Sequence, residues 1–152
     1  MILSSNDIKD GELLDKRFTC DGEALSPHLK WINAPKETKS FAIYCIDPNS
    51  EIGIISHWNV CDIPPSVGEI PQTGPIPGTL IINDFGNLYF EAPCPKEGMH
   101  QYIFKIFALN IERLEGVTVL NFRKTIRKHT LDSAEITCSY EREFDFRMFR
   151  HL

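Results

Sequence analysis

The 152-residue sequence lacks the features that define several large protein classes. It has no apolar run of 18 residues, and its first residues lack the basic region and apolar core of a secretory signal, so we expect neither a transmembrane segment nor a leader. Acidic residues outnumber basic ones, and the net charge of −5 argues against a nucleic-acid partner. There are no internal repeats and no low-complexity segments.

Cysteine is scarce, and its spacing shows no pairing. The five cysteines are odd in number, lie far apart and include no CxxC pair, which argues against a zinc ribbon or a disulfide framework. They are Cys20, Cys45, Cys61, Cys94 and Cys138. We therefore predict free thiols in a reducing compartment, and a cytoplasmic protein.

The sequence does contain enough apolar residues, 42% of the total, for one globular domain over residues 1–152. Most of the apolar pattern is typical of β-strands, and it predicts strands over 13–19, 29–32, 39–47, 54–63, 80–83, 100–109 and 135–140. One amphipathic helix is predicted over 118–130, and the tail 143–152 fits either period. The fold class is mostly β, an antiparallel two-sheet sandwich with one or two peripheral helices near the C-terminus.

Two of these strands carry a histidine close to turn-forming residues. Strict alternation along 54–63 places His57 and Trp58 on opposite faces, while alternation along 100–109 places His100 and Tyr102 on the same face. Asp47 ends another apolar strand at a Pro48 turn. Two histidines, an aspartate and a tyrosine suggest a small polar pocket of the size of an anion.

Several motifs then follow one another in an ordered series. They are FTCDGEALSPHLKW at 18–31, DPN at 47–49, HW at 57–58, NDFG at 83–86, PCP at 93–95, GMHQY at 98–102 and HTLDSAEITCSYER at 129–142. Together they resemble the phosphatidylethanolamine-binding protein family, in its bacterial and archaeal branch of Raf-kinase-inhibitor-like proteins.

The resemblance implies a Greek-key β-sandwich and a non-catalytic binding protein whose pocket takes phosphate, a phosphorylated group or a phospholipid head group. Carried over by position, the pocket residues are Asp47, Asn49, His57, Pro93, His100 and Tyr102. The resemblance also implies a kinase or protease as a regulated partner and a homodimer, for which the apolar tail 144–149 is a candidate contact. It implies no cofactor and no metal.

The sequence departs from the family pattern at three positions. Asn49 replaces the usual second aspartate of the turn, Gln101 replaces the usual arginine, and Ile55 stands where an aromatic residue is common. One acid and one base are lost together, so the net charge of the pocket is kept but its electrostatic strength is lower. We therefore expect a plain anion to fit better than a phosphoethanolamine head group.

The residue chemistry is consistent with anion binding. Two ring N–H groups and the Tyr102 O–H can donate to anion oxygens, and Gly98 would let backbone amides approach. Asp47 would accept from one histidine and fix its tautomer.

Other interpretations of the same residues are open. Cys94 and His100 could form a thiolate–imidazole pair for hydrolysis or group transfer. Asp47, His57 and His100 are ligand types that suit zinc, although no local HxxxH supports such a site. His57, Tyr102 and Asp47 could also serve only the core or a turn.

Overall fold

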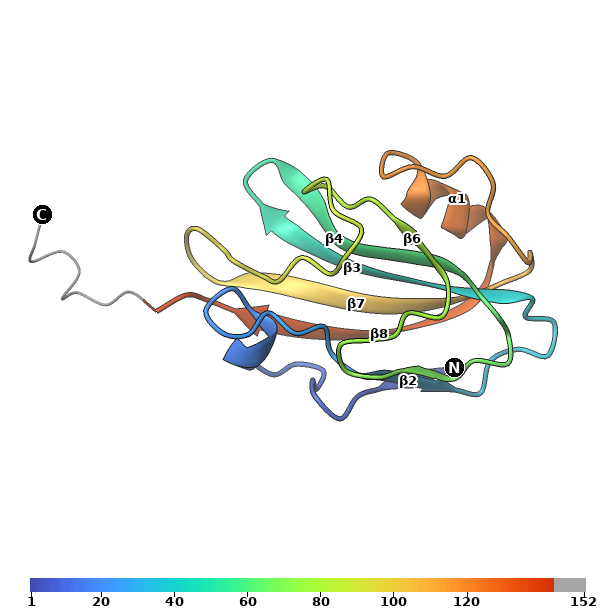
Figure 1. The fold of residues 1–152 in the computed structure, drawn as a ribbon, viewed down its shortest axis with the longest axis horizontal. Coiled ribbons are helices and arrows are strands. Elements are labelled where there is room, and N and C mark those ends of the chain that lie inside the picture. The colour runs from blue at the N-terminus through green and yellow to red at the C-terminus, as the bar shows by residue number, and fades with distance from the viewer. Residues whose placement is uncertain (144–152) are drawn as a thin grey trace, which may run out of the picture.

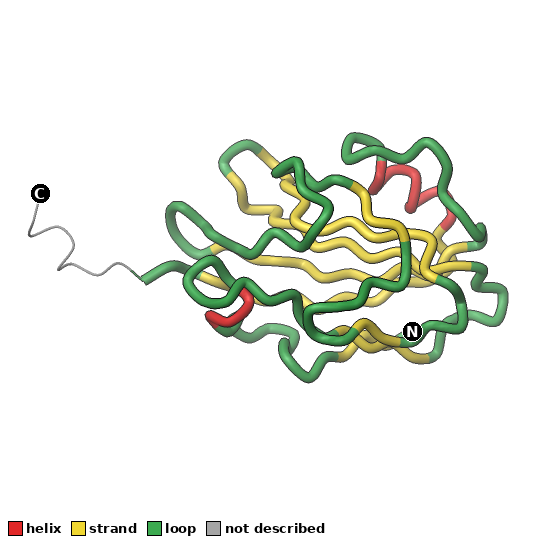
Figure 2. The backbone as a smooth tube through the Cα atoms, in the orientation of Figure 1, coloured by secondary structure: helices red, strands yellow, loops and turns green. Residues whose placement is uncertain are grey.

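The computed structural model of the protein describes residues 1–143. Its elements in chain order are β1 (Ile2–Ser4), the 3₁₀ turn η1 (Lys16–Phe18), β2 (Leu29–Ile32), β3 (Ser40–Ser50), β4 (Gly53–Ile63), β5 (Glu69–Ile70), β6 (Thr79–Ile81), β7 (His100–Leu109), α1 (Phe122–His129) and β8 (Thr130–Tyr140). The predicted mostly β fold is confirmed, with strands running through the molecule and helix confined to its periphery (Figure 2).

The strands form two sheets with antiparallel pairing. The larger sheet has five strands in the order β6-β4-β3-β7-β8, and the smaller has three in the order β1-β2-β5. The chain leaves β4 at one side of β3, visits the small sheet at β5 and returns through β6 before β7 pairs with the other side of β3 (Figure 1). This long crossover places β4 and β7, which carry the two histidines, on either side of β3.

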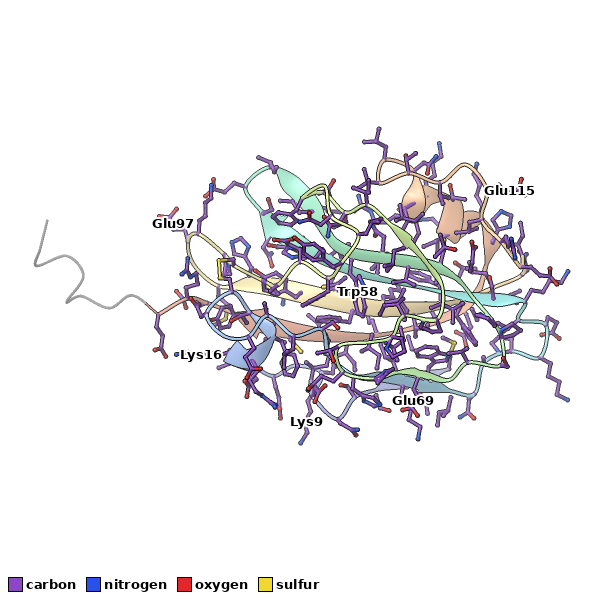
Figure 3. All side chains as sticks on the ribbon, viewed as in Figure 1. Lys9, Lys16, Trp58, Glu69, Glu97 and Glu115 are labelled. Atoms are coloured by element: carbon purple, nitrogen blue, oxygen red, sulfur yellow. A yellow bond between two sulfur atoms is a disulfide. The ribbon has the colours of Figure 1, made fainter. Side chains whose placement is uncertain are left out.

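Apolar side chains explain why β3 lies at the centre of the large sheet. Phe41, Ile43 and Cys45 belong to the core between the two sheets, where Trp58 lies near the middle of the molecule (Figure 3). The alternate residues of β3 face a second core beneath α1. A strand that is buried on both faces must be a nearly continuous apolar run, as residues 39–47 are.

The late helix and the last strand follow the sequence prediction with shorter or longer bounds. Phe122 and Ile126 are the buried residues of α1, which covers the outer face of the large sheet. In β8, the alternating residues Ile136, Cys138 and Tyr140 are buried in the core between the sheets. The tail proposed as a dimer contact, 144–149, lies outside the described residues.

The strand predicted over 13–19 is wrong. Leu13 makes only an isolated bridge to Ser139, and the chain then turns into η1. Backbone bonds from Gly11 to Thr137 and from Leu14 to Ser139 lay this segment along the outer edge of β8. Its backbone groups are satisfied at the sheet edge, which a regular strand alternation could not reveal.

Candidate functional site

A cavity of about 290 Å³ opens at the end of the large sheet where β3 ends and β7 begins. This is near the lower end of the size range of ligand pockets, roughly 300–1,000 Å³. Its walls come from the β3–β4 hairpin, the loop before β7 and the adjoining parts of β3, β4 and β7. Its lining residues include Asp47, Glu51, His57, Phe85, Glu91, Cys94, Lys96, Glu97, His100 and Tyr102.

His57 reaches this cavity because β4 contains a β-bulge. Cys45 pairs with Trp58 and Ile46 with Ser56, so His57 is the extra residue between two pairs. A bulge interrupts the alternation of side chains and re-aims the inserted one. His57 therefore lines the cavity against Tyr102, which belongs to the same core between the sheets as Trp58, so His57 and Trp58 both point to that side of the large sheet. The prediction that these two residues lie on opposite faces is wrong for this reason.

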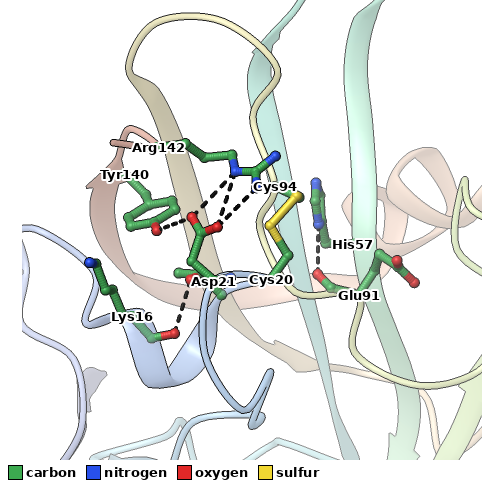
Figure 4. Close-up of a disulfide and its surroundings, with 9 residues drawn as sticks. Lys16, Cys20, Asp21, His57, Glu91, Cys94, Tyr140 and Arg142 are labelled. Atoms are coloured by element: carbon green, nitrogen blue, oxygen red, sulfur yellow. Dashed lines mark hydrogen bonds and ion pairs between the residues drawn. A yellow bond between two sulfur atoms is a disulfide. The ribbon is translucent and has the colours of Figure 1, made fainter. Parts of the chain in front are cut away.

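The tautomer of neutral His57 is fixed by a backbone carbonyl. Nδ1 lies 2.7 Å from the carbonyl oxygen of Glu91, which can only accept, so Nδ1–H donates (Figure 4). Nε2 is then the unprotonated nitrogen of the neutral ring. Burial lowers the pKa of His57 below its ordinary value of 6.5, more than the neighbouring Glu91 and Asp47 raise it. At neutral pH, His57 consequently presents a hydrogen-bond acceptor rather than the N–H expected from its sequence.

His100 is oriented by a carboxylate in the same way. Its Nδ1 lies 2.6 Å from Oδ2 of Asp47, a residue only 4% exposed, so Nδ1–H donates and Nε2 is again the free ring nitrogen. The other oxygen of Asp47 accepts the backbone N–H of Asn49 at 2.7 Å. Asp47 thus fixes both a ring and the turn beside it.

Tyr102 lies between the two histidines. Its ring is 5.4 Å from that of His57 and 6.5 Å from that of His100, measured between centroids. Burial raises the pKa of Tyr102 well above its ordinary value of 10, so the hydroxyl keeps its proton and can donate. Within residues 1–143, no hydrogen bond partner is seen for this hydroxyl.

The remaining two predicted site residues, Asn49 and Pro93, lie near the cavity but do not line it. Asn49 is exposed, and its Oδ1 accepts the backbone N–H of Gln101 at 2.7 Å, tying the end of β3 to the start of β7. Pro93 is buried and its carbonyl accepts the N–H of Cys20 at 3.1 Å. Neither is among the lining residues. Gly98 also lies outside the lining. Its φ of 69° is the reason for a glycine here, because no other atom lies close enough to exclude a side chain.

The charges around the cavity are mainly acidic. Asp47, Glu51, Glu91 and Glu97 line it, and Lys96 is the one lysine or arginine among its described lining residues. Glu97 lies at the outer edge, on the loop before β7 (Figure 3). A bare anion would therefore depend on the Tyr102 hydroxyl and on imidazole rings that carry a proton at Nε2, more than on a positive field from lysine or arginine.

The prediction of five free thiols is wrong for Cys20 and Cys94. Cys20 and Cys94 form a disulfide, with Cα atoms 5.3 Å apart, while Cys45, Cys61 and Cys138 are free and buried (Figure 4). The two partners are 74 residues apart in sequence, so only the tertiary fold brings them together. The bond removes the thiolate that the Cys94–His100 enzyme alternative required. It also removes the free-thiol argument for a reducing compartment.

The zinc alternative finds no support either. Across the described part of the chain, no group of three or more histidine, cysteine, aspartate or glutamate side chains is arranged to hold a metal ion.

The structure also contains no helix, within residues 1–143, that is long and apolar enough to cross a membrane.

Sequence reasoning missed two contributors to the site. Glu91 acts on His57 through its backbone carbonyl, which no side-chain pattern can reveal. Phe85 packs edge-on against His57 with centroids 4.9 Å apart. Its position in the NDFG segment at 83–86 was the available signal.

Taken together, the fold and the cavity define a β-sandwich protein with a small cavity at one end of its large sheet. The model of the phosphatidylethanolamine-binding protein family matches residues 4–141. The chain therefore belongs to the phosphatidylethanolamine-binding protein family.

Relatives from bacteria support this membership. A UPF0098 protein of Aquifex aeolicus is 41% identical over 121 residues, which cover 75% of this chain and 71% of the relative. The UPF0098 protein YbhB of Escherichia coli K12 is 36% identical over 157 residues, covering 92% and 99% of the two chains. Neither name states a catalytic activity.

Solved structures show the same fold. The Escherichia coli protein YbcL superposes with a TM-score of 0.83 at 30% identity, covering 93% of this chain and 98% of YbcL. The phosphatidylethanolamine-binding protein homologue CT736 of Chlamydia trachomatis gives a TM-score of 0.85 at 28% identity, with 93% and 97% covered.

Proposed function

We propose that the chain is a non-catalytic binding protein whose cavity takes a small anionic group: phosphate, a phosphorylated molecule or a phospholipid head group. His57, His100 and Tyr102 would contact the anion, while Asp47, Asn49 and Pro93 would hold those contacts in place. The observation that carries this proposal is the pair of imidazoles whose Nδ1 atoms are both engaged, which leaves both Nε2 atoms available in a cavity that Tyr102 also lines.

The strength of the site follows from the number of its contacts. A hydrogen bond to a charged group contributes about 1.5–3 kcal/mol, and three such bonds must offset the entropy lost on association. The expected affinity is therefore in the range of about micromolar to millimolar. That range suits a binding module.

The acidic wall supports a particular kind of ligand. Glu51, Glu91 and Glu97 would repel a bare anion but attract an ammonium group carried on the same molecule. This favours a zwitterion such as phosphoethanolamine, against the preference that the loss of family charges suggested. The proposal also includes regulation of a kinase or protease that binds at the mouth of this cavity.

Isothermal titration calorimetry tests the proposal with three ligands: inorganic phosphate, phosphoethanolamine and glycerol phosphate, which lacks the ammonium. His57→Asn keeps an N–H near the Glu91 carbonyl but removes Nε2, and His100→Ala removes the second ring. Both variants should lose binding, whereas His129→Asn on α1, outside the cavity, should bind like the wild type. Unchanged affinity in both cavity variants would refute the proposal, and equal affinity for the two phosphomonoesters would refute the zwitterion preference.

A further inference from the structure

The Cys20–Cys94 disulfide forms part of the cavity wall. Cys94 lines the cavity, whereas Cys20 follows η1 in a different part of the chain and is not among the lining residues. Both cysteines are exposed. Figure 4 shows the bond joining the turn at Cys20 to the loop that runs past His57. A reductant in solution can therefore reach a covalent bond that borders the proposed site.

The bond fastens a loop that has few other attachments. Residues 94–99, here called the wall loop, connect the Pro93 region to β7 and contribute Cys94, Lys96 and Glu97 to the cavity. Among residues 1–143, no hydrogen bond joins the wall loop to another segment; the bonds that flank it run from Cys20 N–H to the carbonyl of Pro93, at 3.1 Å, and from His100 Nδ1–H to Asp47, at 2.6 Å. Packing of the buried Pro95 is its other restraint.

The other end of the disulfide is held firmly. Asp21, next to Cys20, accepts hydrogen bonds from the Tyr140 hydroxyl and from Arg142, whose Nη2 lies 3.0 Å from Oδ1 (Figure 4). Tyr140 is the last residue of β8 and pairs with His100. The disulfide therefore fixes the wall loop to the same strand pair that carries His100.

We propose that this disulfide is a redox-controlled latch on the cavity, and that its reduction weakens the binding of small anions. The inference rests on the proposed function. With the bond intact, the wall loop and its Lys96 are held at the cavity. Without it, ordering the wall loop adds an entropy cost to each binding event.

A dithiol reductant supplies the electrons for this step. One thiolate of the dithiol attacks a sulfur of the disulfide, the S–S bond breaks, and a mixed disulfide forms. The second thiolate of the reductant then displaces the protein sulfur and leaves an oxidised, cyclic reductant. Two electrons pass to the protein, and the two protons from the dithiol end on the thiols of Cys20 and Cys94.

Calorimetry with inorganic phosphate on three samples tests the latch: oxidised wild type, wild type reduced with dithiothreitol, and Cys20→Ala. This variant breaks the latch at the partner outside the cavity and leaves Cys94 in place. Reduced wild type and Cys20→Ala should both bind about ten-fold more weakly than the oxidised protein, corresponding to about 1.4 kcal/mol. Dithiothreitol should leave Cys20→Ala unchanged. Equal affinity of oxidised wild type and a folded Cys20→Ala would overturn the latch.

A second readout does not depend on the ligand. Amide hydrogen exchange in residues 96–99 should be faster in reduced wild type and in Cys20→Ala than in the oxidised protein. If oxidised wild type binds no phosphate, the proposed function fails and exchange alone decides. Identical exchange in the three samples would then overturn the latch.

Discussion

The binding of a fully deprotonated anion should depend steeply on pH, because the free nitrogen of neutral His57 is an acceptor. Sulfate has no proton to donate to that nitrogen, so it needs the imidazolium form of the ring. Burial lowers the pKa of His57 below 6.5 in the free protein, while a bound anion would raise it. Sulfate binding should therefore take up a proton from solution at neutral pH.

The sign and size follow from linkage. Below the pKa of the free protein, the ring is already charged and the affinity is constant. Between the free and bound pKa values, affinity falls about ten-fold for each pH unit, so it drops about 30-fold from pH 6.5 to pH 8 if the bound pKa lies above that range. The carboxylates facing His57, those of Asp47, Asp84 and Glu91, raise its pKa and work against burial without outweighing it.

Calorimetry in pairs of buffers with different ionisation enthalpies measures the proton uptake directly. One proton per sulfate is expected near pH 7, and phosphate should show less because its own P–O–H can donate to Nε2. His57→Asn, which cannot titrate, should lose the part of the pH dependence that belongs to this ring. Sulfate binding with no proton uptake and no pH dependence would refute the reasoning from tautomer to ligand.

Two further substitutions, each with a matched control, separate the site from the core. Tyr102→Phe should weaken anion binding about 10- to 150-fold, through loss of one hydrogen bond to a charged group, whereas Tyr89→Phe, outside the cavity lining, should not; calorimetry on both decides. Ile106→Ala, at a fully buried position between the sheets, should lower the free energy of unfolding by about 2–5 kcal/mol in urea titrations. Leu120→Ala, at a 93% exposed position, should stay within about 0.5 kcal/mol, and equal effects would contradict the assigned core.

Residue periodicity was enough to predict most of the fold. The continuous apolar run of β3 marked a strand buried on both faces, and the alternation in β7 and β8 placed their core residues correctly. These predictions succeeded because burial acts on each residue of a regular strand in the same way. The predicted strand over 13–19 failed because a short bridge and a 3₁₀ turn leave no regular period.

The site was predictable in composition but not in geometry. The motifs selected Asp47, His57, His100 and Tyr102, which the fold brings to one cavity. The bulge at His57 could not be predicted, since a strand with one extra residue reads like any other until its partner is known. The Cys20–Cys94 bond could not be predicted for a similar reason, because it depends on contacts between segments that are distant in sequence.

The most direct test of the central claim is a crystal structure grown with selenate below pH 6, with the anion located by the anomalous signal of selenium. The account predicts a selenate in the cavity, with oxygens within about 3.2 Å of Nε2 of His57, Nε2 of His100 and the hydroxyl of Tyr102. A cavity without selenate, in crystals where the anion binds surface lysines or arginines instead, would contradict it.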